Sequence, residues 1–304
     1  MWRFLKNLRK KPPRKIGLAL SGGGARGLAH IGVLKVLEQE GIPIDYLAGT
    51  SMGGFIAAAY AAGLGIDFIE QEALRMASPR RLLALADPSL LRRGLFEGRK
   101  VLEYLVGHLG DCTFDSLRLP LALVTVDLNS GREVILREGQ LADAVRATTA
   151  IPGVFAPVER DGQLLVDGGL LDNLPADVAR GMGADIVIAV NVVTDSEAMS
   201  SLIQTFQHRR YVPNGLAGTV DVLYRSLGVM MTEISRRRLS EAHPEVVIRP
   251  EIPPEVTTLT GFPRAAEIIA AGEKATQEAL PRIREMGVAQ GLPGRNLLNC
   301  ATCS

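Results

Sequence analysis

Cysteine, histidine and long apolar runs are all scarce in this chain of 304 residues. Three cysteines are too few for a disulfide framework, since Cys112 is isolated and Cys300 and Cys303 lie in a polar C-terminal tail. The C-x-x-C spacing of that pair fits a metal or redox site, but no second ligand pair lies nearby, which favours an incidental tail. We therefore expect no metal and no cofactor.

No apolar run is long enough to span a membrane, and the N-terminus lacks the apolar core of a signal peptide, so we expect a cytoplasmic location.

Positive charge is concentrated at the N-terminus. Residues 1–15 carry seven basic side chains and no acid, and removing these from the total of 34 leaves 27 basic against 33 acidic residues. The remaining chain has no basic excess, so we expect no nucleic-acid partner. Residues 1–14 also contain Trp2 and Phe4, which makes them a short basic amphipathic segment. It is either an interfacial anchor, holding the protein at the inner face of the membrane through Trp2, Phe4 and the basic residues 3–15, or a solvated leader.

Buried-type strands alternate with helical patterns along residues 15–288, which is typical of an α/β fold. The strand predicted at 185–192 is almost continuously apolar, as expected for a central strand of a parallel sheet. We find no internal repeat and no linker long enough to divide the chain. We therefore predict one three-layer α/β domain over residues 15–288 with a mainly parallel central sheet, followed by a flexible tail at 289–304.

Three further segments give expectations that a structure can test. Residues 78–97 read as irregular, basic and apolar, and could form one wall of a cleft. Residues 194–214 read as a polar loop or the base of a lid. Residues 216–239 read as one long helix with a broad apolar face, for which we expect core packing, with lipid contact as the alternative; the face consists of Val220, Leu223, Leu227, Met230, Met231 and Ile234.

A G-x-S-x-G pentapeptide, residues 49–53, stands between a predicted strand at 45–48 and a helix-forming run at 55–62. Strand, sharp turn and helix is the context of a nucleophile elbow, in which Ser51 is held in a strained conformation with its hydroxyl exposed. Gly49 and Gly53 are needed because the residues two before and two after the serine crowd each other. The following helix directs its positive end at the serine.

A second glycine-rich turn, residues 22–27, lies between a strand at 16–20 and a helix that ends near Glu40. The backbone N–H groups of Gly22, Gly23 and Gly24 could converge on a developing oxyanion, with Arg26 adding a positive charge or tying the loop in place. The alternative is dinucleotide binding, because Gly22, Gly24 and Gly27 satisfy G-x-G-x-x-G. That motif needs an acidic residue at the end of the second strand, and Asp45 stands at its start.

The serine needs a general base, and the four histidines are poorly placed to supply one; they are His30, His108, His208 and His243. Asp167 is the better candidate because it ends an apolar strand, where residues reach a cleft, and Gly168 and Gly169 leave space beside it. Partial burial would raise its proton affinity. The alternative is an ordinary Asp-Gly turn. Asp172 reads as a turn former.

Four blocks, taken together and in order, resemble the motif set of the patatin-like phospholipase family: G-G-G-A-R-G, G-T-S-M-G, A-T-T-A-I-P-G-V-F-A-P and D-G-G. The chain is most similar to the bacterial cytoplasmic branch, which is related to the catalytic domain of neuropathy target esterase. The resemblance covers about residues 15–195. It implies a patatin-like α/β fold and a Ser/Asp-dyad hydrolase of lipid esters, with Ser51 as nucleophile and Asp167 as base. It also implies an oxyanion hole at Gly22, Gly23 and Gly24 supported by Arg26, with the motif glycines in support: Gly27, Gly49, Gly53, Gly168 and Gly169.

Two other functions stay open at this point. A thioesterase or protease could use the same dyad on acyl-CoA or peptide substrates. A regulatory protein could keep the fold and act by binding a partner, although it would not need an intact dyad.

Overall fold

The computed structural model describes residues 14–89, 93–193, 214–256 and 261–286. The predicted N-terminal segment and the predicted loop at 194–214 lie outside the described residues except for one residue at the edge of each. The predicted tail, with Cys300 and Cys303, lies wholly outside them.

Eight strands form the main sheet, in the order β10-β9-β1-β2-β4-β8-β7, with β5 on the second edge of β4. Their bounds are β1 Ile16–Leu20, β2 Tyr46–Thr50, β4 Leu121–Asp127, β5 Arg132–Leu136, β7 Val158–Arg160, β8 Gln163–Asp167, β9 Ile186–Val190 and β10 Val246–Ile248. The pairings from β10 to β4 are parallel, whereas β5, β8 and β7 run antiparallel to their neighbours. The sheet is therefore mixed, and its parallel part is the part that contains the two glycine-rich turns.

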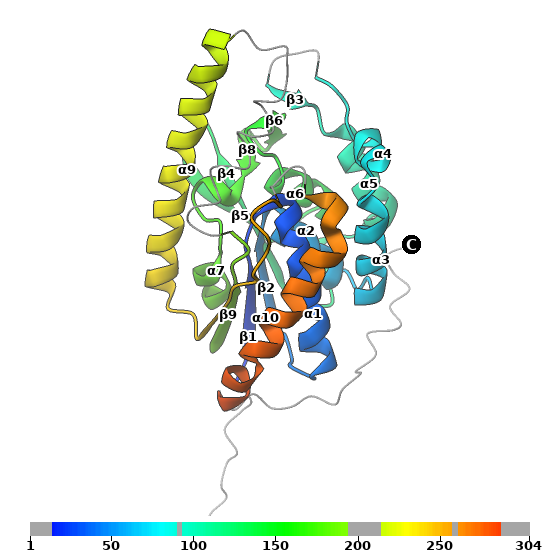
Figure 1. The fold of residues 1–304 in the computed structure, drawn as a ribbon, viewed down its shortest axis with the longest axis vertical. Coiled ribbons are helices and arrows are strands. Elements are labelled where there is room, and N and C mark those ends of the chain that lie inside the picture. The colour runs from blue at the N-terminus through cyan, green and yellow to red at the C-terminus, as the bar shows by residue number, and fades with distance from the viewer. Residues whose placement is uncertain (1–13, 90–92, 194–213, 257–260, 287–304) are drawn as a thin grey trace, which may run out of the picture.

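Helices cover both faces of this sheet (Figure 1), which confirms the predicted three-layer α/β fold. One face carries leucines and isoleucines of the strands and packs against α1 (Ala29–Gln39), α2 (Ser51–Ala61) and α10 (Ala265–Glu285). The other face carries alanines and valines and packs against α7 (Ala176–Gly181) and the last residues of α9 (Asn214–Ala242). Alternation of side chains along each strand produces the two different faces.

The remaining elements lie around the edges. They are α3 (Ile66–Met76), α4 (Pro79–Ala84), β3 (Gly94–Phe96), α5 (Arg99–Leu109), α6 (Leu141–Thr148) and β6 (Gly153–Phe155), together with short 3₁₀ turns η1 (Gly24–Leu28), η2 (Phe114–Ser116), η3 (Gly168–Leu170) and η4 (Phe262–Arg264). β3 and β6 form a separate two-stranded parallel sheet.

Strands β2 and β8 meet end to end along one edge of β4. Val124 pairs with Thr50, the last residue of β2, and Thr125 pairs with Asp167, the last residue of β8. Because β5 occupies the other edge of β4 at these positions, β2 and β8 must share one edge. The two strands approach from opposite directions, so their carboxyl ends meet beside the centre of β4. This junction brings Ser51 and Asp167 together.

Two expectations differ from the structure. Residues 78–97 are more regular than predicted, since they contain α4 and β3, and β3 is fixed by pairing with β6. Core packing is wrong for part of the face predicted on α9, where the side chains of Leu223 and Met230 are 57% and 59% exposed. Leu239 and Ala242, near the C-terminal end of this helix, pack against the sheet. Among the described helices, none is both long enough and apolar enough to cross a membrane.

Candidate active site

Ser51 stands at the turn between β2 and α2 and has a φ of 54°, in the left-handed region that non-glycine residues rarely adopt. The turn is so tight that a Cβ on Gly53 would lie 2.4 Å from the carbonyl oxygen of Leu20, and one on Gly49 would lie 2.6 Å from the Cα of Gly54. Neither contact leaves room for a side chain. The predicted elbow is therefore present, and its two glycines are required by close backbone approach.

The carboxyl group of Asp167 lies beside Ser51 where β2 and β8 meet on β4. Both residues are only 6% exposed. Burial raises the pKa of Asp167 to about 6, and the hydrogen bonds from Ser51 and from the backbone N–H of Gly169 oppose that rise. The Gly169 bond measures 2.8 Å. A carboxylate with this proton affinity, in contact with a hydroxyl, can accept the hydroxyl proton near neutral pH.

Thr148 holds the backbone of the elbow in place. Its Oγ1 accepts a hydrogen bond of 3.0 Å from the N–H of Ser51 and donates one of 2.6 Å to the carbonyl of Val124. The residue lies at the end of α6 and is fully buried. The sequence analysis included Thr148 in a motif block but assigned it no role. The feature that could have pointed to it is the pair of threonines at the end of the predicted helix.

The glycine-rich loop differs in one respect from the prediction. The N–H of Gly22 donates to the carbonyl of Asn173 at 3.0 Å, so it is already used in a structural bond. Within the described part of the chain, the N–H groups of Gly23 and Gly24 have no acceptor. Gly22 nevertheless lies against Ser51, since a Cβ added to it would be 3.1 Å from the Cβ of that serine.

Arg26 ties this loop to the rest of the protein. It is 3% exposed, and its guanidinium donates to the carbonyls of Val192 at 2.9 Å and Val256 at 3.1 Å. Of the two roles considered for it, tying the loop is the one that these bonds favour. The supporting glycines are equally confined: a Cβ on Gly27 would lie 2.5 Å from Met52, and one on Gly168 would lie 2.4 Å from the carbonyl of Val124.

Asp172 is more than the turn former that we predicted. Its side chain is buried beside Arg238 of α9, at 3.3 Å, and burial raises its pKa, which the guanidinium opposes. Arg238 also pairs with Glu133 and Asp177, each at 2.6 Å. The backbone carbonyl of Asp172 accepts a 2.8 Å bond from the hydroxyl of Thr50, the residue before Ser51. This ion cluster therefore connects α9 to the elbow.

Among the histidines, His30 is fully buried, with its Nε2 2.8 Å from the carbonyl oxygen of Ser21. Burial lowers its pKa to about 4, so it is a neutral packing residue, as the sequence indicated. His108 is in contact with Tyr104 of α5, and His243 follows α9, while His208 lies outside the described residues. The described residues contain no group of three or more His, Cys, Asp or Glu side chains that could hold a metal ion.

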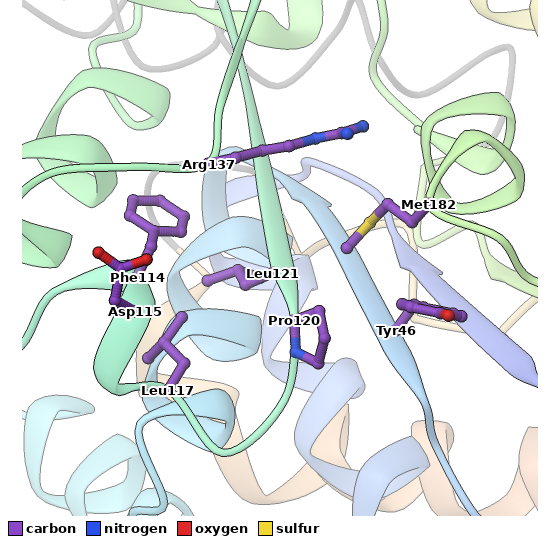
Figure 2. A pocket seen from close by; sticks show the side chains of 8 residues that line it. All are labelled: Tyr46, Phe114, Asp115, Leu117, Pro120, Leu121, Arg137 and Met182. Carbon is purple, nitrogen blue, oxygen red and sulfur yellow. The ribbon is translucent and has the colours of Figure 1, made fainter.

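A hollow of about 410 Å³ lies at the opposite end of the sheet from Ser51. Figure 2 shows Tyr46 and Met182 on one side of it and Phe114 and Leu117 on the other, with Leu121 between them. Tyr46 begins β2 and Ser51 follows its end, so about 16 Å of strand separates the hollow from Ser51. The hollow is not part of the Ser51 site.

Comparison with known proteins supports a single family. Residues 18–180 match the family model described as patatin-like phospholipase. An NTE family protein of Mycobacterium tuberculosis is 40% identical over 178 residues, which cover 59% of this chain and 49% of that protein. Patatin-like phospholipase domain-containing protein 6 of Homo sapiens is 39% identical over 186 residues, or 60% of this chain and 14% of its own length. Neuropathy target esterase sws of Drosophila melanogaster is 35% identical over 181 residues, or 58% and 13%. The matched part of this chain thus corresponds to half or less of each relative.

Proposed function

Because this chain belongs to the patatin-like phospholipase family, we propose that it is a serine hydrolase of lipid esters, acting on phospholipids, lysophospholipids or related acyl esters. The names of two relatives, a phospholipase domain-containing protein and an esterase, agree with that substrate class. The observation that carries the proposal is the junction of β2 and β8, where Ser51, in its strained turn, meets the buried carboxyl of Asp167.

In the proposed reaction, the Asp167 carboxylate accepts the proton of Ser51 as its oxygen attacks the ester carbonyl. The backbone N–H groups of Gly23 and Gly24 and the amino end of α2 stabilise the tetrahedral oxyanion. Asp167 then gives the proton to the departing alcohol, which leaves an acyl ester on Ser51. Water attacks that ester with Asp167 again as base, and the fatty acid is released.

The test is turnover of short-chain p-nitrophenyl esters and of a phospholipid by Ser51→Ala and Asp167→Asn. We expect a loss of at least about a thousandfold in each, because each removes a group that the chemistry needs. Ser226→Ala and Asp143→Asn, which change exposed residues of the same types, are the controls and should retain wild-type rates. Substantial turnover by either site variant would overturn the dyad.

Two further measurements separate the alternatives. A panel of phospholipid, lysophospholipid, acyl-CoA and peptide substrates distinguishes a lipid hydrolase from a thioesterase or protease with the same dyad. A fluorophosphonate probe should label the wild type and not Ser51→Ala, whereas a regulatory protein without activity would not be labelled.

A further inference from the structure

Residues 79–89 and 93–100 present basic and apolar side chains outward together. Leu83 of α4 is 73% exposed and Leu95 of β3 is 40% exposed. The described part of this segment carries five basic residues, all exposed: Arg80, Arg81, Arg93, Arg99 and Lys100. We call this set, with the two leucines, the α4–β3 surface.

Of the acidic residues in the same segment, Asp87 is buried and Glu97 is half-buried. Asp87 accepts hydrogen bonds from the backbone N–H groups of Gly98, Arg99 and Lys100, where α5 begins. Glu97 accepts a hydrogen bond from Ser89 within the segment. Arg93 pairs with an acid from elsewhere in the chain, Glu159, at 2.5 Å. The segment thus presents net positive charge to solvent, although the chain after residue 15 is net negative.

This surface is attached directly to the candidate active site. Arg146 of α6 donates to the carbonyls of Glu97 at 2.7 Å and Gly98 at 3.1 Å, and it is 5% exposed. Two residues further along α6, Thr148 holds the N–H of Ser51. Figure 1 shows α4 and β3 toward the end of the molecule at which α2 begins, with β3 beyond the main sheet.

We propose that the α4–β3 surface docks the protein on an anionic lipid bilayer, and so brings the Ser51 site to its substrate. Anionic headgroups attract arginine and lysine, and the boundary between headgroups and acyl chains accepts an exposed leucine. The surface offers both kinds of side chain together. An acidic protein would use the charges but would leave Leu83 exposed beside them. The inference rests on the proposed lipid-ester hydrolase function for its purpose, although docking itself is measured without turnover.

The experiment is cosedimentation of the full chain with sucrose-loaded vesicles of phosphatidylcholine, alone or with one third phosphatidylglycerol. Arg80→Glu/Arg81→Glu reverses two charges of the surface. The matched control, Lys274→Glu/Arg282→Glu on α10, reverses two exposed charges elsewhere and gives the same net charge. A third variant, Leu83→Ser, removes the most exposed apolar side chain of the surface.

We expect the wild type and the control to bind the anionic vesicles and not the neutral ones, with binding weakened by salt. Arg80→Glu/Arg81→Glu should partition about thirtyfold more weakly, and Leu83→Ser about fivefold more weakly. Hydrolysis of vesicle lipid should fall in the same order, while turnover of a water-soluble p-nitrophenyl ester stays at the wild-type rate in all of them.

Equal binding by Arg80→Glu/Arg81→Glu and the control would overturn the proposal and assign any vesicle binding to another part, such as the basic residues 1–15. Failure of the wild type to bind anionic vesicles would also overturn it, and retention on immobilised polyglutamate in that case would assign the surface to an acidic protein. The proposed chemistry fails separately, through residual turnover in Ser51→Ala, and that result leaves the vesicle measurement intact.

Discussion

Replacing Asp167 by asparagine should abolish activity and also change how stability depends on pH. In the wild type, burial raises the pKa of Asp167 from 3.8 to about 6. A group whose pKa is raised by folding contributes stability that is fully present below its unfolded pKa and is lost as the pH rises through its folded pKa. Asparagine does not titrate. The wild type should therefore lose stability relative to Asp167→Asn between these two pKa values.

The size of this effect follows from the pKa shift. Each pKa unit corresponds to about 1.4 kcal/mol, so the free energy of unfolding of Asp167→Asn minus that of the wild type should rise by about 2 to 3 kcal/mol between pH 4 and pH 8. Any cost of placing an amide beside Ser51 and Gly169 is the same at both pH values and cancels from this difference.

The assay is urea unfolding of both proteins at several pH values, followed by the far-ultraviolet circular dichroism of the helices. A stability difference that stays constant from pH 4 to pH 8 would refute a raised pKa at Asp167. In the same protein preparations, kcat/KM of the wild type should fall about tenfold per pH unit below pH 6, because only the ionised carboxylate accepts the proton.

Three other substitutions test the architecture around the site. Gly53→Ala should lower the free energy of unfolding in urea by about 3 kcal/mol, because its Cβ would meet a backbone carbonyl. Gly107→Ala, which has open space around it in α5, should instead raise the free energy of unfolding by about 0.5 to 1 kcal/mol. Similar losses in both variants would contradict this account. Arg238→Met should cost about 3 kcal/mol at pH 8 by leaving Asp172 buried and unpaired, and addition of Asp172→Asn should restore most of it; a double variant as unstable as the single one would argue against the pairing. Thr148→Val should lower kcat at least about tenfold by removing the acceptor for the backbone N–H of the nucleophile, while Thr148→Ser keeps the wild-type rate; equal rates in the two would show that this bond is dispensable.

The parts of the site that the sequence predicted are those controlled by local geometry. Gly49 and Gly53 flank Ser51 within five residues, so the crowding that requires them can be inferred from a strand, a turn and a helix. Asp167 was predicted because it ends an apolar strand. Its contact with Ser51, however, depends on β2 and β8 meeting on one edge of β4, and no local pattern gives that strand order.

The parts that the sequence missed depend on distant partners. In the sequence, Asp172 resembles an ordinary turn residue. Its ion pair with Arg238 depends on the position of α9, which is distant in the sequence. The N–H of Gly22 looked available for an oxyanion until the carbonyl of Asn173 was found to accept it. The amphipathic pattern of α9 could not show that Leu239 and Ala242 pack against the sheet while Met230, within the predicted apolar face, is exposed.

Asp127 also contacts a serine, Ser130, yet its carboxyl group has a much lower pKa than that of Asp167. Contact with a serine therefore does not alone determine which aspartate can act as a base. Like Asp167, Asp127 is a buried residue at the end of a strand, and it pairs with Leu165 of β8. Its carboxylate accepts bonds from the hydroxyl and N–H of Ser130 and from the N–H groups of Asn129 and Leu164, which lower its pKa to about 2. Asp167 has two donors, the Ser51 side chain and one backbone N–H, and keeps a pKa of about 6. Burial is the largest effect on the pKa of Asp167 and outweighs its two donors, whereas the donors of Asp127 outweigh its desolvation. That balance would suit Asp167 to receive a proton from the neighbouring serine.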